Sequence, residues 1–263
     1  MATVATFSMK LIRADEHLQV LNGEIANFLR THPYEVVRQQ NVPRGYLSAK
    51  VAYRHAPPDR LLMLIGDVLY NLRSALDHLA WSLAGTHADI HTEFPIFMDS
   101  SKFSAIEKNG IPKHGSGLKK MHDMPAPAQT IIESLQPYNR PHRLPQEIEP
   151  LWLLHKLGIE DKHHTLNLVA AGVDLHVDVS TSTKHPAYGL TGRTGYLPLK
   201  DGAEIYCIPL PADPSQVQDH SRPIFDVALD PEGPGRGISL REGLHDMRKA
   251  VAEAISLLAP LVP

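Results

Sequence analysis

This sequence has a single cysteine, and it lacks long apolar runs and a large excess of one charge. One cysteine in 263 residues excludes an internal disulfide framework and a zinc site built from several cysteines. The formal net charge of −3 provides no global basic field, so a protein that coats DNA non-specifically is not expected. No apolar run approaches the ~20 residues that span a bilayer, and the N-terminal segment lacks the pattern of a secretory leader. We therefore expect a cytoplasmic protein without a membrane segment.

The composition is that of an ordinary globular chain, with 43% hydrophobic and 21% charged residues, enough to build a sizeable core. Apolar spacing, proline and glycine positions predict a helical core, a hairpin near the N-terminus and a strand-rich part toward the C-terminus. The sequence therefore predicts an α+β fold in a single domain, 1–263, with a helical bundle core and a small antiparallel sheet formed by the hairpin and the C-terminal strands. The expected helices lie at about 9–31, 60–84, 126–158 (as 128–135 and 147–157) and 240–258, the hairpin strands at 34–40 and 46–55, and the later strands at 166–171, 175–180, 204–210 and 224–229, within 165–230.

The helix expected at 60–84 has two unlike faces. One continuous arc is apolar, which is typical of a face buried in a core, and Gly85 is expected to end the helix. The opposite stripe carries an acid, an amide, a hydroxyl and an imidazole at spacings of four, three and four: Asp67, Asn71, Ser74 and His78. Arg73 and Asp77 stand between the faces at i,i+4, where they can pair. The stripe is either a solvated face with a surface salt bridge or the polar wall of a site.

A second polar segment runs from His155 to His164. Trp152, His155 and Ile159 would share one face of the helix ending near Leu157, and Asp161 to His164 would form the turn beyond it. In that turn, Asp161 could accept a hydrogen bond from the ring of His163 and fix its tautomer. The alternative is a polar turn that only caps the helix. Because desolvated polar groups need partners, we expect the two polar segments to meet in space.

Four motifs resemble a widespread family of uncharacterised bacterial proteins of similar length. They are Gly66–His78, which contains Asn-Leu-Arg-Ser-Ala-Leu-Asp-His, then Phe94–Phe97, Leu135–Tyr138, and Leu154-His155 with Asp161-Lys162-His163. Together they cover roughly residues 60–165.

A more distant resemblance is to the HEPN superfamily of helical nucleotide-binding and RNase domains. Its signature is an arginine followed four to six residues later by a histidine on one helix, and Arg73 and His78 fit the shortest form. The resemblance implies metal-independent RNA cleavage, in which His78 is the acid/base and Arg73 stabilises the charged phosphorane. On a helix the two residues point about 140° apart, so they would converge across a homodimer interface or with Arg73 reaching round.

Other constellations are weaker. A mixed site for Zn²⁺, Mn²⁺ or Fe²⁺ is conceivable from the histidines and aspartates of both segments, but no fixed ligand spacing such as HExxH is present. Thr191–Gly195 lacks the features of a phosphate loop and is expected to be a turn. Cys207 is expected to be a buried, inert thiol in a strand.

Three functional hypotheses follow. The first is a metal-independent endoribonuclease of toxin or defence type, with no cofactor and with RNA or a nucleotide as partner. Its catalytic residues would be Arg73, His78, Asn71, Asp77 and His163, and its substrate-binding residues Asp67, Ser74, His155, Asp161 and Lys162. The second is a non-catalytic helical domain that binds a nucleotide or a protein. The third is a metal-dependent hydrolase or oxygenase using the His/Asp cluster.

Overall fold

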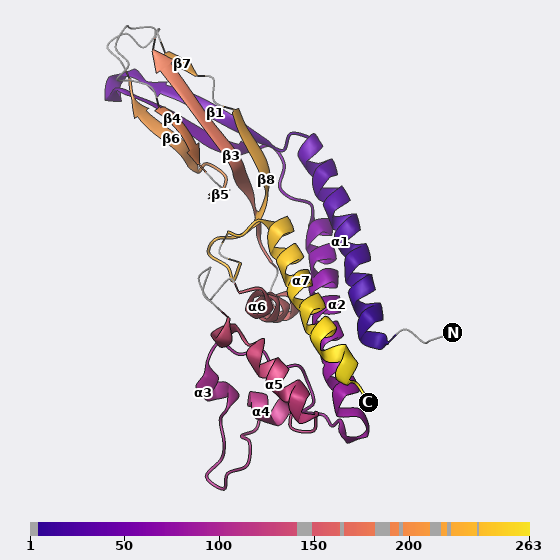
Figure 1. The fold of residues 1–263 in the computed structure, drawn as a ribbon. Helices are drawn as coiled ribbons and strands as arrows, with labels where there is room; N and C mark the ends of the chain where they lie inside the picture. The colour runs from indigo at the N-terminus through magenta and orange to yellow at the C-terminus, as the bar shows by residue number, and fades with distance from the viewer. Residues whose placement is uncertain are drawn as a thin grey trace. The chain divides into compact units, whose positions relative to one another are not determined.

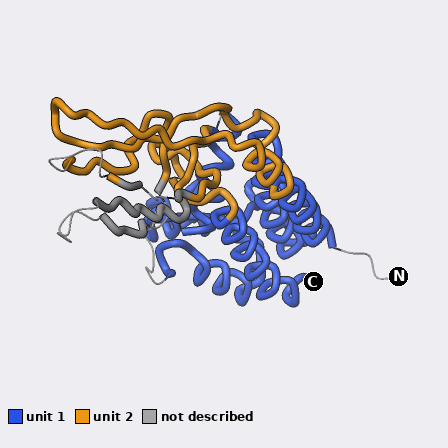
Figure 2. The backbone as a smooth tube through the Cα atoms, turned by 90° about the horizontal axis from the view of Figure 1, so that it is seen from above, with its two compact units in different colours: residues 1–21, 62–166, 242–263 blue, residues 22–61, 167–241 orange. Residues whose placement is uncertain are grey.

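The structure is a computed structural model of the chain. It describes residues 5–140, 149–163, 166–181, 190–194, 197–210, 217–219, 222–235 and 237–263 (Figure 1). The chain divides into two compact units, which are coloured separately in Figure 2. Unit 1 comprises residues 1–21, 62–166 and 242–263, and unit 2 comprises residues 22–61 and 167–241.

Unit 1 is helical. Its long helices come from both ends and the middle of the chain, and short helices fill the connection after α2. The α-helices are α1 (Thr6–Arg30, of which residues 22–30 belong to unit 2), α2 (Asp59–Ala84), α3 (Ser100–Phe103), α4 (Gly117–Lys120), α5 (Ala126–Ser134), α6 (Pro150–His163) and α7 (Leu240–Leu258).

Helix α2 forms the centre of the core of unit 1. Its apolar arc is almost fully buried, as the spacing predicts, and consists of Val68, Leu69, Leu72, Ala75, Leu76, Leu79 and Ala80. The helix ends where Gly85 adopts a φ of 57°, a left-handed conformation that glycine reaches without a steric penalty.

Polar contacts join the helices of unit 1. Lys10 on α1 lies over the ring of Tyr70 on α2, 5.1 Å from its centroid. Arg248 on α7 makes two hydrogen bonds to Asp15 on α1, of 2.8 and 2.7 Å. These pairs agree with Figure 1, in which α7 and the first half of α1 run beside α2.

The closest approach of α6 to α2 occurs at a glycine. A Cβ atom added to Gly66 would lie only 2.9 Å from a carboxylate oxygen of Asp161. The absence of a side chain at this position therefore lets the last turns of α6 lie against α2, next to the polar part of that helix.

Unit 2 contains two antiparallel sheets. The first has the order β1-β2-β6 and is built from the N-terminal hairpin and one later strand. The second is centred on β3, which pairs with β4, β5, β7 and β8. The strands are β1 (Tyr34–Asn41), β2 (Tyr46–Tyr53), β3 (Leu168–Thr181), β4 (Leu190–Thr194), β5 (Leu197–Leu199), β6 (Glu204–Pro209), β7 (Val217–Asp219) and β8 (Arg222–Leu229).

Tyr53 ties the two sheets together. Its hydroxyl donates a hydrogen bond of 2.6 Å to the carbonyl of Leu199 on β5 and accepts one of 2.6 Å from the amide of Ala170 on β3. Its ring also lies 4.9 Å from that of Tyr34, which in turn contacts Phe28 and Phe225. A single aromatic cluster thus fills the space between strands that lie far apart in sequence.

The α+β fold and the hairpin-based sheet are confirmed, and the prediction that the chain is one domain stays a prediction. Three local predictions are wrong. The strands expected at 166–171 and 175–180 are one strand, β3, because the irregularity between Gly172 and Asp174 shifts its register against β8 without ending it. Residues 191–194 belong to β4 and are not a turn, since they pair with β3. Cys207 lies in β6 as expected, but its thiol is exposed, because its position alternates with that of buried Tyr206.

A further correction concerns α6. The predicted stop at Gly158 does not occur, and the helix continues through His163. One glycine inside a helix costs only about 1 kcal/mol, which the buried leucines of α6 outweigh. No helix in the described parts of the chain is long and apolar enough to cross a membrane.

Candidate functional site

A pocket of about 260 Å³ opens in unit 1 between α2 and α6. The middle of α2 forms one wall, the second half of α6 forms the other, and Glu93 from the connection after α2 completes it. The wall contains both apolar and polar groups, as is usual for small-ligand sites. The lining residues are Leu69, Tyr70, Arg73, Ser74, Asp77, Glu93, Leu154, His155, Gly158, Ile159, Asp161 and Lys162.

Arg73 is held rigidly at this wall. Its Nε and Nη2 atoms donate to the two carboxylate oxygens of Asp77 at 3.0 and 2.7 Å, and Nη2 also donates to the carbonyl of Phe94 at 2.8 Å. The backbone amide of Phe94 donates back to Asp77 at 3.1 Å. The predicted i,i+4 pair is therefore confirmed, but it is not a simple surface salt bridge, because the side chain of Arg73 is only 18% exposed and also anchors the Phe94 segment.

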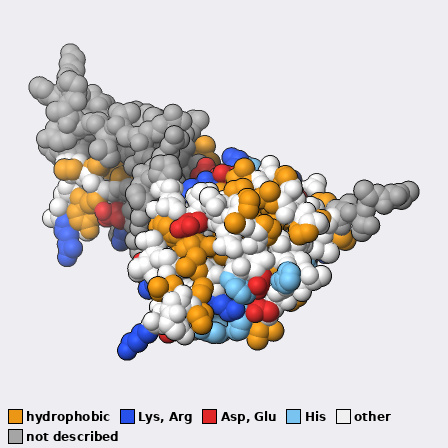
Figure 3. All heavy atoms as spheres, turned by 60° about the horizontal axis from the view of Figure 1, so that its bottom comes forward, with side chains coloured by type: hydrophobic (Ala, Val, Ile, Leu, Met, Phe, Trp, Pro, Cys, Tyr) orange, Lys and Arg blue, Asp and Glu red, His pale blue; other side chains and the backbone are white. Residues whose placement is uncertain are grey.

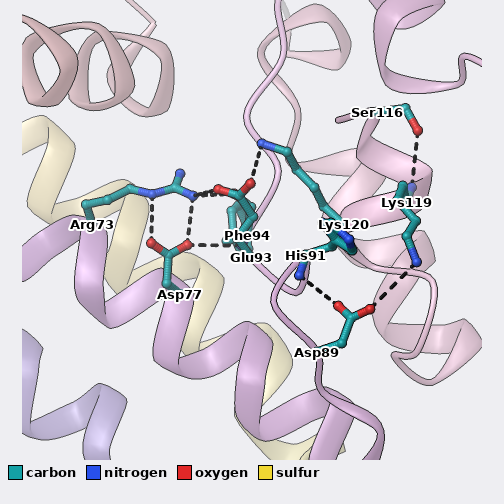
Figure 4. A network of polar contacts seen from close by, with 9 residues as sticks. All are labelled: Arg73, Asp77, Asp89, His91, Glu93, Phe94, Ser116, Lys119 and Lys120. Atoms are coloured by element: carbon teal, nitrogen blue, oxygen red, sulfur yellow. Dashed lines mark hydrogen bonds and ion pairs between the residues drawn. The ribbon is translucent and has the colours of Figure 1, made fainter. Parts of the chain in front are cut away.

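The third guanidinium nitrogen of Arg73 is different. Nη1 is buried and has no hydrogen-bond partner among the described residues. Figure 4 shows this nitrogen pointing away from Asp77 and Glu93. A buried donor without a partner costs about 1–3 kcal/mol, so such atoms are rare unless a ligand or water completes them.

Glu93 extends the network to a second cation. One of its oxygens lies 3.4 Å from Nη2 of Arg73 and the other 2.8 Å from Nζ of Lys120 on α4 (Figure 4). Arg73 and Lys120 thus alternate with Asp77 and Glu93, and each positive charge is matched by a carboxylate.

His155 brings an uncharged imidazole to the pocket. Burial, together with the charges of Arg73, Lys120 and Lys156, lowers the pKa of His155 to about 4, although Glu93 acts in the opposite direction. Its ring lies 5.5 Å from that of Trp152, one turn earlier on α6. At neutral pH the imidazole is therefore unprotonated and offers one donor and one acceptor.

The pocket brings together six of the ten residues predicted from sequence, and residues of both polar segments meet there. The six are Arg73, Ser74, Asp77, His155, Asp161 and Lys162. The other four do not line it. Asn71 is buried, and its amide donates to the carbonyl of Asp67 in the preceding turn of α2. Asp67 is exposed and lies 3.6 Å from the ring nitrogen of His17.

The two histidines assigned to catalysis lie outside this lining. His78 is on α2 beyond the end of the pocket, and the angular separation from Arg73 explains why only Arg73 reaches the wall. His163 is exposed in the last turn of α6. Asp161 cannot orient it as expected, because residues two apart on a helix point to different sides. His164 lies outside the described residues.

Metal binding gains no support from the described parts of the chain, which contain no group of three His, Cys, Asp or Glu residues placed to hold an ion. Two histidine rings lie close together in the loops beyond α2. The rings of His91 and His114 lie 5.0 Å apart there, and His122 contacts Asp123. Figure 3 shows histidine side chains gathered with acidic and basic ones on one face of the protein.

Sequence reasoning missed Glu93 and Tyr70, which also line the pocket, whereas Ile159 was expected on the helix face of His155 and lines the pocket with it. Glu93 directly precedes the Phe94–Phe97 motif, and this was its only signal, because the connection after α2 has no periodicity. Tyr70 and Ile159 are exposed apolar residues on helices whose other faces are buried. Searches of family models, of curated proteins and of solved structures give no significant match to this chain.

Proposed function

We propose that unit 1 binds a nucleotide, free or within RNA, in the pocket between α2 and α6. The observation that carries the proposal is Arg73, a buried and rigidly held guanidinium whose Nη1 has no partner among the described residues. No described hydrogen bond satisfies the side chains of Ser74 or His155 either. Three hydrogen-bonding groups beside apolar walls suit a ligand that is partly polar and partly flat and apolar.

Binding is tested directly by titrating the full chain with the four ribonucleoside 5′-monophosphates in a calorimeter. We expect at least one to bind, and Arg73→Lys to weaken it by tenfold or more, because lysine cannot reproduce the planar fork held by Asp77. Arg248→Lys is the matched control, since Arg248 makes the same two-bond pair with Asp15 but does not line the pocket. If none of the four binds, or both variants bind like wild type, the proposal fails.

A second candidate function is metal-independent RNA cleavage. One observation favours it: Arg73 and His155 line the same pocket, which places a guanidinium that can stabilise a phosphorane near an imidazole that can accept a proton. The pKa of about 4 makes this imidazole a weak base at neutral pH. In this arrangement His155 takes the role that the sequence suggested for His78.

Incubating a mixed RNA with wild type and variants separates these assignments. If His155 is the base, His155→Ala abolishes cleavage and His78→Ala leaves it; if the arginine–histidine pair of α2 acts across a homodimer, the result is reversed. In either case the products should carry cyclic phosphate ends and form in the presence of EDTA. Nucleotide binding by a wild type that does not cleave RNA would leave the non-catalytic function.

A further inference from the structure

We infer that the pocket holds the uncharged base of its ligand and leaves the phosphate outside. This inference rests on the proposed nucleotide binding and refines it, because it states which part of the nucleotide is recognised.

The charges of the pocket compensate one another. Asp77 binds Arg73 in two places, and Glu93 lies between Arg73 and Lys120. The remaining charged residues of the lining are one acid, Asp161, and one base, Lys162. His155 adds no charge at neutral pH, because its pKa lies near 4. A phosphate would therefore meet no net positive field, and it would approach the carboxylates of Asp77 and Glu93.

The free groups of the pocket can pair with both donors and acceptors of a ligand. The neutral imidazole of His155 and the hydroxyl of Ser74 line the pocket and can each donate and accept. Nη1 of Arg73 is a buried donor that has no acceptor among the described residues. A phosphate ester offers acceptors alone, whereas the edge of a nucleobase carries carbonyl or ring-nitrogen acceptors beside N–H donors. A phosphate can only accept from these groups, whereas the edge of a base can also donate to the acceptor atoms of His155 and Ser74. A base therefore uses more of their hydrogen-bonding capacity than a phosphate does.

Size and apolar walls agree with a base. A volume of about 260 Å³ falls just below the ~300–1,000 Å³ usual for ligand pockets, so the pocket is suited to one ring system rather than a whole dinucleotide. Leu69 and Leu154 are buried and give the walls an apolar floor, while Tyr70 and Ile159 keep exposed apolar surface at the rim. A flat ring could slide between these side chains and lose its contact with water.

The phosphate of a bound nucleotide would then lie near Lys162. This lysine is exposed in the last turn of α6, and among the described residues it forms no ion pair. An exposed ammonium attracts an anion only weakly and in a salt-dependent way. The phosphate should thus add little to the affinity.

The experiment compares ligands that carry only one of the two parts. The full chain is titrated with the four ribonucleosides, their 5′-monophosphates and ribose 5-phosphate, at 50 and 300 mM NaCl. We expect a nucleoside to bind within about threefold of its monophosphate at the higher salt concentration, and ribose 5-phosphate not to bind. Nucleoside affinity should be nearly independent of salt.

Variants locate the binding. Ser74→Ala and His155→Gln should each lower nucleoside affinity about tenfold. Ser82→Ala, on the same helix with its hydroxyl bonded to the carbonyl of His78, and His245→Gln, exposed on α7, should not. Lys162→Ala should affect the monophosphate alone, and less than threefold.

The outcomes separate the two proposals. A monophosphate that binds while its nucleoside binds at least thirtyfold more weakly, or ribose 5-phosphate that binds as well as the monophosphate, would overturn base recognition and leave nucleotide binding standing. Absence of binding by every nucleoside and nucleotide would overturn both.

Discussion

The two faces of α2 differ in the contacts that determine their burial. The apolar arc is buried along its whole length. The opposite side varies in exposure: Met63 is 72% and Tyr70 61% exposed, whereas Arg73 is mostly buried. The buried arc follows from helical periodicity alone. The polar side depends on partners such as Glu93 and Phe94, which come from a different segment of the chain. The buried face of a helix can thus be predicted from the sequence of that helix, whereas its contribution to a site depends on how other segments pack against it.

The largest expected effect is on the buried face. Leu72 and Leu76 are both fully buried, so Leu72→Ala or Leu76→Ala should lower the free energy of unfolding by about 2–5 kcal/mol, through lost burial and the cavity left behind. Urea unfolding followed by circular dichroism measures this loss. Met63→Ala on the exposed side is the control and should change stability by less than about 0.5 kcal/mol. Equal effects on both faces would contradict the division of α2.

The next prediction compares two arginine–aspartate pairs, each held by hydrogen bonds from Nε and Nη2. Arg73→Met should destabilise the protein by roughly 1–3 kcal/mol, because the carbonyl of Phe94 loses the donor from Arg73 and Asp77 keeps only the amide of Phe94. Arg248→Met should cost at most about 1 kcal/mol, since Arg248 and Asp15 are more exposed. Urea unfolding gives the free energy of unfolding of each variant. A larger loss in Arg248→Met than in Arg73→Met would show that Arg73 is not a structural anchor.

A smaller effect is the response of His155 to acid. Its pKa is about 4 in the folded protein and about 6.5 when unfolded, so the unfolded chain takes up the proton first. The stabilisation is complete above pH 6.5 and is lost as the pH falls toward 4. After allowance for partial exposure, wild type should lose about 1–2 kcal/mol more than His155→Gln between pH 7 and pH 4.5. Equal losses of unfolding free energy in wild type and His155→Gln over this pH range would contradict the lowered pKa of His155.

Much of this fold could be predicted from sequence, and the reasons are local. The helix at 240–258 and the hairpin follow from periodicity and turn residues, and both are confirmed. The pairing of Arg73 with Asp77 follows from the i,i+4 rule. The choice between His78 and His155 could not be made, because both histidines stand on helices beside apolar faces and only the packing of α6 on α2 places one of them in the pocket. The exposure of Cys207 likewise depends on which face of its sheet is covered.

The smallest expected effect concerns the close approach of the two helices that form the pocket. Alanine is favoured over glycine inside a helix by about 1 kcal/mol, and Gly23→Ala on α1 should show most of this gain because a Cβ there meets no atom within 4 Å. At Gly66 the new methyl would lie 2.9 Å from the carboxylate of Asp161, which is the end of a flexible side chain and can move aside. Gly66→Ala should therefore gain only a few tenths of a kcal/mol, and the difference from Gly23→Ala measures what displacing Asp161 costs.

In an Asp161→Ala background, Gly66→Ala should recover the full gain. Thermal or urea unfolding of the two single variants, Asp161→Ala and the double variant closes this cycle, and equal gains at both glycines in the wild-type background would show that α6 does not constrain α2 at this point.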